Sequence, residues 1–354
     1  MRLVTSYLLK TVIAATGLVL LVLLALAGFI EFIGQLDNTG EGSYTTSGAV
    51  LYTALRLPLL AVEMLPVATL LGALLGLGAL AGNSELIAMR AAGISAPRLA
   101  MSVSISGFIL AVLGAVLGEY IAPPLDQFAR QYRSSARTDN ASVGERNTWV
   151  RDGQRIFNVE GVNDRFGFGG FYVFEIDEQQ RLTRVGTASR ADLTSEGDWL
   201  LDNYSETTFK ADGIEAARDV FAKQGYQVDP DVLGIAALRP GSLSFGGLLA
   251  YLRYLEQNKL DSRAYTTELW GRVSNVIAVI LMPMLAIGFV FGSLRSTGAG
   301  ARLLVGVLIG LGYFLASRTL ANSGQVFSID PMLVGLAPAV VLALVTAFAV
   351  ARVR

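Results

Sequence analysis

The sequence contains no cysteine and no histidine among its 354 residues. Without cysteine there is no disulfide framework and no thiol nucleophile, and without either residue there is no Cys- or His-based zinc site and no Ser-His-Asp triad. Charge is also scarce, since 16% of the residues are charged, whereas an average soluble domain has about 25%. Hydrophobic residues make up 53% of the chain, so much of its surface must face something other than water.

A phosphate-binding P-loop is missing as well. Such a loop needs Gly-Lys followed by Ser or Thr, and the chain contains no Gly-Lys pair. If the protein uses ATP, another subunit must therefore hydrolyse it. The carboxylates of Asp152, Asp164 and Asp177 are scattered over a polar interval, a pattern typical of solvated turns. No catalytic group, metal site or cofactor is predicted.

What the sequence does have is long apolar segments. A hydrocarbon core about 30 Å thick is spanned by roughly 20 apolar residues, and only a helix satisfies its own backbone there. Two glycine pairs at four-residue spacing, Gly72 with Gly76 and Gly306 with Gly310, predict close helix packing. The six predicted spans are Thr11 to Leu36, Leu57 to Ala81, Leu99 to Ala122, Val273 to Phe291, Leu303 to Leu320 and Met332 to Ala351.

The short loops differ in their content of lysine and arginine. Basic residues mark the cytoplasmic side of a membrane protein, and the loops at 37–48 and 321–331 contain none. This asymmetry predicts that both termini are cytoplasmic and that the long interval between spans three and four lies outside. The basic residues are Arg2, Lys10, Arg90, Arg98, Arg295, Arg302, Arg352 and Arg354.

The long interval has the pattern of a β-domain. Short runs rich in aromatic and β-branched residues are separated by turn pairs such as Asp152-Gly153, which predicts a small sandwich, barrel or jelly roll. After them, leucines at three- and four-residue spacing predict a helix over Leu243 to Asn258. The predicted strands are Thr148 to Arg151, Arg155 to Glu160, Gly170 to Asp177, Arg181 to Val185 and Trp199 to Tyr204.

The loop between spans two and three predicts a short helix on the cytoplasmic side. Ser84 is suited to cap it, Glu85 lies in its first turn and Gly93 is suited to end it. Leu86, Ile87 and Met89 give it an apolar side. This local pattern fits two interpretations equally, a helix that docks on a partner protein and a plain connecting helix at the membrane surface.

Several of these segments carry motifs in a characteristic order. Together they resemble the LptF/LptG family of lipopolysaccharide export permeases over nearly the whole chain. Gly42-Ser-Tyr and Phe291-Gly-Ser-Leu-Arg look more like the G-type than the F-type subunit. The motifs are Gly72-Ala-Leu-Leu-Gly-Leu-Gly-Ala-Leu-Ala, Ser84-Glu-Leu-Ile-Ala-Met-Arg-Ala-Ala-Gly, Glu119-Tyr-Ile-Ala-Pro, Ala129-Arg-Gln-Tyr-Arg, Trp149-Val-Arg-Asp-Gly and Phe291-Gly-Ser-Leu-Arg-Ser.

The resemblance implies a membrane α-helical bundle of six transmembrane helices with an inserted all-β periplasmic jellyroll domain. The corresponding domains are residues 1–122 with a coupling helix near 83–97, residues 123–265 with the jellyroll and the amphipathic helix, and residues 266–354. It also implies an LptF-type permease subunit, two LptB ATPase subunits, LptC and the periplasmic bridge protein LptA as partners. Lipopolysaccharide would be extracted from the outer leaflet of a Gram-negative inner membrane.

The resemblance also implies roles for particular residues. The coupling helix would seat in the ATPase through Ser84, Glu85, Leu86 and Met89. Arg130 and Arg133 would meet substrate phosphates, for which fork-shaped guanidinium donors are suited. The apolar positions that match cavity-lining residues of the family are Met64, Leu65, Tyr313 and Phe314.

The outer end of the first span departs from the family pattern. Members often carry basic residues there, whereas this chain has Glu31, Asp37 and Asn38. Arg318, near the outer end of span five, is expected to supply positive charge to the substrate instead. Intramembrane charges tend to face a cavity or a partner. Glu31 and Arg318 are therefore expected either to pair with each other or to have separate roles.

Two other functions fit parts of the sequence. A secondary transporter driven by an ion gradient would agree with the three-plus-three grouping of spans and with the intramembrane Glu63. A membrane scaffold would use the β-domain to bind a periplasmic partner. Co-purification of an ATPase subunit separates the exporter from both.

Overall fold

The computed structural model describes residues 2–137, 147–160, 167–168, 170–177, 179, 181–193, 198–210, 212–224, 240–291, 298–326 and 329–352. The chain divides into two compact units. The helical unit comprises residues 1–37, 50–129 and 263–354, and the β unit comprises residues 38–49 and 130–262. Asp164, Arg295, Arg354 and the end of the Phe291 motif lie outside the described residues.

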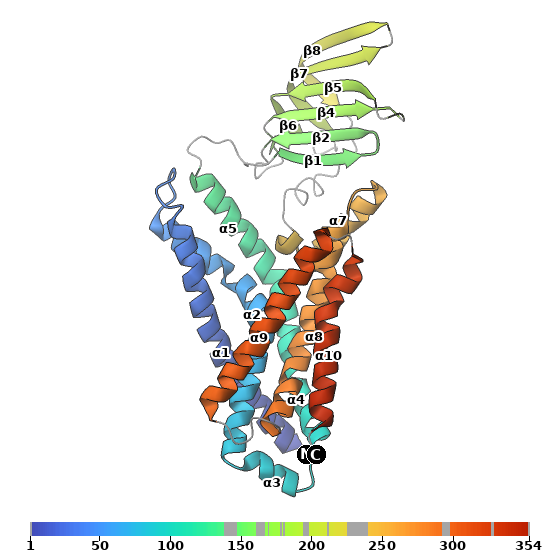
Figure 1. Cartoon of the computed structure of the whole chain (residues 1–354). Helices are drawn as coiled ribbons and strands as arrows, with labels where there is room; N and C mark the ends of the chain where they lie inside the picture. The colour runs from blue at the N-terminus through green and yellow to red at the C-terminus, as the bar shows by residue number, and fades with distance from the viewer. Residues whose placement is uncertain are drawn as a thin grey trace. The chain divides into compact units, whose positions relative to one another are not determined.

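The helical unit contains the apolar helices (Figure 1). The part of the chain that the structure describes has six helices long and apolar enough to cross a membrane, which confirms the six predicted spans. All but the last extend well beyond the apolar run that predicted them. They are α1 (Arg2–Leu36), α2 (Thr46–Gly82), α4 (Ala96–Val116) with its continuation, α8 (Arg263–Phe291), α9 (Ala299–Val326) and α10 (Pro331–Ala351). A short helix, α3 (Glu85–Ala91), joins α2 to α4.

The third span was predicted to end at Ala122, just before Pro123 and Pro124, but the helix does not stop there. Helix α4 passes through one π-helical turn, η1 (Leu117–Ile121), into α5 (Ala122–Arg137), whose first turn contains Pro123 and Pro124. A proline has no backbone N–H to donate the usual helical hydrogen bond, and its ring clashes with the carbonyl four residues earlier. Here those carbonyls belong to the wider π turn, whose different hydrogen bonding accommodates both rings. The helix therefore continues as one element to Arg137.

The helices pack closely through small residues. A Cβ at Gly72 of α2 would lie 2.4 Å from Cα of Thr16 in α1, and a Cβ at Gly310 of α9 would lie 2.7 Å from the Val67 side chain of α2. The predicted role of the glycine pairs in helix approach is thus confirmed. Helix α8 packs against both α4 and α10. The main core is built from buried residues of five helices and of α3, such as Leu8, Leu74, Leu86, Leu99, Met282 and Leu342.

The described strands of the β unit form one antiparallel sheet. Its described strands are β1 (Asn147–Asp152), β2 (Arg155–Glu160), β3 (Gly167–Phe168), β4 (Phe171–Ile176), β5 (Leu182–Ala188), β6 (Arg190–Leu193), β7 (Trp199–Lys210) and β8 (Gly213–Gln224). The sheet order is β1-β2-β4-β5-β7-β6-β3, with β8 on β7 (Figure 1). Strands β5 and β6 pair with successive parts of β7, at residues 205–208 and 199–202 respectively. Asn203 and Tyr204 lie between these two parts, and Asn203 has a φ of 51°.

Alternate residues of these strands form the core of the β unit. Phe157, Phe171, Val173, Trp199 and Leu201 are buried, as the period of two in a half-buried strand requires. Phe174 lies on the other face, where its ring stacks on Trp149 at 5.8 Å. The fold class, a bundle of six apolar helices with an inserted all-β domain, is therefore confirmed.

Helix α7 (Phe245–Gln257), which follows the short 3-10 turn η2 (Pro240–Ser242), confirms the helix predicted after the strands. Oγ of Ser244 caps it by accepting a bond from N of Gly247 at 3.0 Å. The Tyr254 hydroxyl bonds to both N and O of Arg151 in β1, at 2.9 and 2.8 Å. Since β1 pairs only with β2 among the described strands, α7 covers part of the outer edge of β1.

Candidate functional site

Helix α3 begins and ends where the sequence predicted, but its N-terminus lacks the predicted side-chain cap. The N–H groups of Gly93 and Ile94 donate to the carbonyls of Arg90 and Met89 at 2.9 and 3.2 Å, and Gly93 has a φ of +86°. This is the Schellman ending that Gly93 predicted. The predicted cap by Ser84 is wrong, because Ser84 has a φ of 63° and its side chain makes no capping bond. A capping residue normally has an extended backbone that turns its hydroxyl toward the helix.

The predicted coupling residues lie on different sides of α3. Glu85 is in the first turn, where its carboxylate accepts bonds from the hydroxyl of Tyr7 at 2.8 Å and from Nδ2 of Asn83 at 3.4 Å. Leu86 is 2% exposed and belongs to the main core of the helical unit, and Met89 packs against that core. Ile87 is 42% exposed. The surface that α3 presents is therefore Ile87 with the neighbouring Ala88 and Ser84, flanked by Glu85.

Arg130 and Arg133 lie one turn apart on α5, because the helix continues past Pro124. Residues three apart share one face of a helix, and both side chains are half-buried. Within the β unit, N of Ser43 donates to the carbonyl of Ala136 at 2.7 Å, and Glu41 forms an ion pair with Arg137. These contacts hold the end of α5 against the 38–49 segment.

Arg318 of α9 forms an ion pair with Glu63 of α2, with 2.9 Å between Nη2 and Oε2. Its guanidinium carbon also lies 5.6 Å from the ring centroid of Phe314. A Glu31–Arg318 pair is not formed, because each of these residues has another partner.

The predicted cavity-lining residues do not all face open space. Leu65 is 7% exposed and packs in a cluster with Leu110, Ala111 and Val279, so it is a packing residue in this conformation. Met64 and Phe314 are half-buried, and Tyr313 packs against the main core. The prediction grouped residues of α2 and α9, and in the structure these helices meet where Gly310 faces Val67 and through the Glu63–Arg318 ion pair.

A buried charged cluster escaped the sequence analysis. Arg56 of α2 bonds through Nη1 to Oε1 of Glu31 in α1 at 2.5 Å, and through Nε to Oδ1 of Asp126 in α5 at 3.0 Å. Asp126 is fully buried, and the side chain of Arg56 is 17% exposed. Arg56 also lies over the Tyr52 ring at 5.6 Å. This Arg56 cluster (Glu31, Arg56 and Asp126) connects three helices of the helical unit.

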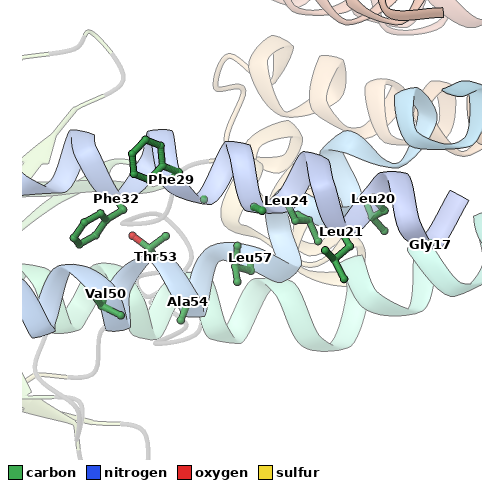
Figure 2. A pocket seen from close by; sticks show the side chains of 12 residues that line it. Gly17, Leu20, Leu21, Leu24, Phe29, Phe32, Val50, Thr53, Ala54 and Leu57 are labelled. Atoms are coloured by element: carbon green, nitrogen blue, oxygen red, sulfur yellow. The ribbon is translucent and has the colours of Figure 1, made fainter. Parts of the chain in front are cut away.

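An apolar groove runs between α1 and α2 (Figure 2). It has a volume of about 740 Å³, and Thr53 is the polar side chain among its lining residues. Gly17 and Gly28 lie on its α1 side, where neither adds a side chain to the groove. Hydropathy alone did not predict this groove, whereas these two glycines of α1 were a signal of it. The other lining residues are Leu20, Leu21, Leu24, Ala25, Phe29, Phe32, Val50, Ala54 and Leu57.

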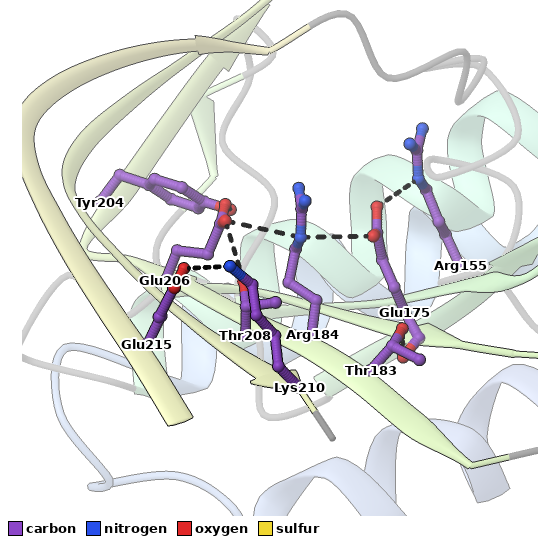
Figure 3. Close-up of polar contacts among 9 residues, drawn as sticks. All are labelled: Arg155, Glu175, Thr183, Arg184, Tyr204, Glu206, Thr208, Lys210 and Glu215. Atoms are coloured by element: carbon purple, nitrogen blue, oxygen red, sulfur yellow. Dashed lines mark hydrogen bonds and ion pairs between the residues drawn. The ribbon is translucent and has the colours of Figure 1, made fainter. Parts of the chain in front are cut away.

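The β unit carries a row of charges across its strands (Figure 3). Nε of Arg155 lies 2.7 Å from Glu175, and Nε of Arg184 lies 3.4 Å from Glu175 and 3.5 Å from Glu206. The Tyr204 hydroxyl donates to Glu206 at 2.9 Å. By strand alternation these residues share the face of the buried aromatic core, so charge borders the apolar part of that face.

Comparisons with known proteins agree with this architecture. The family model described as "Lipopolysaccharide export system permease LptF/LptG" matches residues 6–352. The chain is 32% identical over 335 residues to lipopolysaccharide export system permease protein LptG of Escherichia coli (strain K12), covering 94% of this chain and 93% of that protein. It is 30% identical over 350 residues to the protein of the same name from Haemophilus influenzae, with 98% of each chain covered. The chain therefore belongs to the LptF/LptG family of lipopolysaccharide export system permeases.

Proposed function

We propose that this chain is the transmembrane permease subunit of an ATP-driven exporter that extracts lipopolysaccharide from the outer leaflet of the inner membrane and passes it to a periplasmic bridge. The observation that carries the proposal is the family match over residues 6–352, on a chain whose apolar helices flank an inserted β-domain. With no Gly-Lys pair in the sequence, ATP hydrolysis falls to a partner subunit.

The partners follow from the same family membership. They are an LptF-type permease subunit, a pair of LptB ATPases, LptC and the bridge protein LptA. Helix α3 is the element proposed to meet the ATPase. In support, Leu86 anchors α3 in the core while Ile87 is 42% exposed, which leaves a small apolar surface beside the Glu85 carboxylate. The arginines and lysines of the short loops favour a cytoplasmic position for α3 and an outer position for the β unit.

The substrate contacts combine charge and apolar surface. Arg130 and Arg133 share one face of α5, and two neighbouring guanidinium groups suit the phosphates of lipid A. The groove between α1 and α2, with about 740 Å³ of volume and an almost wholly apolar lining, suits acyl chains. Arg318 is the third proposed contact to phosphate.

Charge reversal at Glu85 tests the coupling helix. Glu85→Lys should impair assembly with the ATPase or ATP-driven export without affecting membrane insertion, because a misplaced charge at an interface can cost several kcal/mol. Tyr7→Phe is the matched control, since it removes the 2.8 Å bond to Glu85 without changing charge. Normal ATPase co-purification together with normal export in the Lys variant would show that α3 is not the coupling helix.

A double charge reversal tests the arginine face. Arg130→Glu with Arg133→Glu should reduce crosslinking to lipopolysaccharide and export, while ATPase assembly survives. Lys at both positions keeps the charge but loses the fork geometry, so it should restore function only in part. Wild-type crosslinking in the Glu double variant would rule out phosphate binding, and full recovery with Lys would indicate simple anchoring at the interface.

A further inference from the structure

The contact between α2 and α9 is a regular seam that ends in an ion pair. A Cβ at Gly306 would lie 2.6 Å from the Leu71 side chain and 2.7 Å from that of Leu74, and a Cβ at Gly310 would lie 2.7 Å from Val67. One helical turn further along α2 from Val67 is Glu63, which reaches Arg318 of α9 at 2.9 Å. Residues four apart share one face of a helix, so Glu63 lies on the same face of α2 as Val67, the face that meets α9.

The pair is open on one side. The side chain of Glu63 is 34% exposed and that of Arg318 is 59% exposed. A guanidinium has five N–H donors, and among the described residues the contacts of Arg318 are one carboxylate oxygen and the Phe314 ring. The fork of Arg318 is thus fixed at one corner by a monodentate bond, whereas an arginine and an oxyanion can form two parallel bonds.

Both residues lie within apolar helices that the family places across a membrane. An unpaired charge there is expensive, so ionisable residues in such helices are paired or functional. Glu63 neutralises Arg318 when no other anion is near. An anion that engages Arg318 must either displace the carboxylate or tolerate its repulsion.

The charge of the incoming group decides this competition. A phosphate monoester carries about −1.5 to −2 charges at pH 7 and three strong acceptor oxygens, which exceeds the charge of one carboxylate. A phosphodiester, as in ordinary phospholipids, carries a single negative charge and gains less over Glu63.

We propose that Glu63 is a positioning and specificity-determining residue that occupies Arg318 in the empty permease and is displaced by a phosphomonoester of the lipid substrate. This rests on the proposed function, in which Arg318 contacts substrate phosphate. Glu63 weakens every anion at Arg318, so that monoester-bearing lipids compete successfully and diester phospholipids do not. After displacement, its negative charge next to the bound phosphate favours release.

The test uses the purified complex of the full chain with its partner subunits in lipid nanodiscs. The probes are lipid A with its phosphate monoesters and the same lipid after enzymatic removal of the phosphates. Glu63→Gln should tighten binding of the phosphorylated probe by up to about fivefold, the range of a partly exposed ion pair. Binding of the dephosphorylated probe should not change. Arg318→Gln should remove the preference for the phosphorylated probe.

A control variant separates this role from general destabilisation. Glu268 pairs with Arg272 within α8 at 3.2 Å and is 37% exposed, so Glu268→Gln removes a similar pair that does not join two helices. It should leave the binding of both probes unchanged. If the Gln variant at Glu63 does not assemble, Glu63→Asp, which shortens the carboxylate's reach, should give a smaller tightening of the same sign.

The outcomes are distinct. Unchanged or weaker binding of the phosphorylated probe in Glu63→Gln or Glu63→Asp overturns the proposal, as does an equal shift for both probes. If the wild-type complex binds neither probe, the proposed function itself fails, independently of Glu63.

Discussion

Removing Arg56, which lies inside α2, should destabilise the helical unit by more than the loss of an exposed ion pair would. In the Arg56 cluster, Arg56→Met leaves Asp126 fully buried without its arginine, because the 3.0 Å bond to Oδ1 is lost. Loss of one partner from a buried ion pair costs roughly 3–5 kcal/mol. The side chain of Glu31 is 22% exposed and can turn toward water, so the loss of its bond to Arg56 adds little to the loss of stability. The expected loss is therefore about 3 kcal/mol, at the lower end of that range.

The assay is reversible unfolding of the purified chain in mixed micelles, titrated with SDS and followed by tryptophan fluorescence of Trp270 after replacing the other two tryptophans. Asp126→Asn keeps an acceptor for Arg56 and removes one charge, so it should cost clearly less than Arg56→Met. Arg56→Met combined with Asp126→Leu replaces the buried pair by apolar groups, which is often neutral, and should recover most of the loss.

Two results would refute this reasoning. A loss below about 1 kcal/mol for Arg56→Met would place it in the range of exposed ion pairs. A double variant as unstable as Arg56→Met alone would show that Asp126 is not the source of the penalty.

Two further substitutions and one pH titration have expected outcomes. Gly72→Val should lower stability by about 1–3 kcal/mol through overpacking, because its Cβ would lie 2.4 Å from the Thr16 backbone. Tyr254→Phe should speed hydrogen exchange in β1 by roughly five- to tenfold, since about 1 kcal/mol of hydrogen bonding to its edge is lost. The backbone N–H of Arg181, and then its side chain, hold the pKa of Asp177 below its usual range. Asp177 should therefore contribute to the free energy of unfolding above the usual aspartate pKa of about 3.9. This contribution should be lost as the pH falls through the lower pKa that Asp177 has in the folded protein, and an NMR titration of Asp177 would show that pKa.

The elements that the sequence predicted are those with a strong local signal. Apolar runs of about 20 residues predicted six spans, and leucine periodicity predicted α7. Gly93 predicted the end of α3, since a left-handed ending needs little beyond the residue itself. The start of α3 at Glu85 agrees with the prediction, whereas the capping bond from Ser84 was predicted wrongly. Ser84 has a left-handed backbone conformation, which residue propensity does not reveal.

The charged contacts could not be predicted, because they join segments far apart in the chain. Arg56 precedes an apolar run and has the pattern of an ordinary membrane-flanking arginine. Asp126 follows Pro123 and Pro124, where the helix was expected to stop, so nothing indicated that it is buried. Glu31 was considered as a partner for Arg318, and the packing of α2 between the two helices gives each another partner. Helix order in sequence does not specify helix neighbours in space.

The anchoring of α3 has a mechanical consequence. Leu86 belongs to a cluster that also includes residues of α1, α2, α4, α8 and α10, while the adjacent Ile87 is exposed. Because protein interiors are close-packed and have low compressibility, a displacement of α3 cannot be absorbed at Leu86 and must move its neighbours. A force applied to the Ile87 surface is therefore transmitted to five helices at once, with no compliant joint between the point of contact and the bundle.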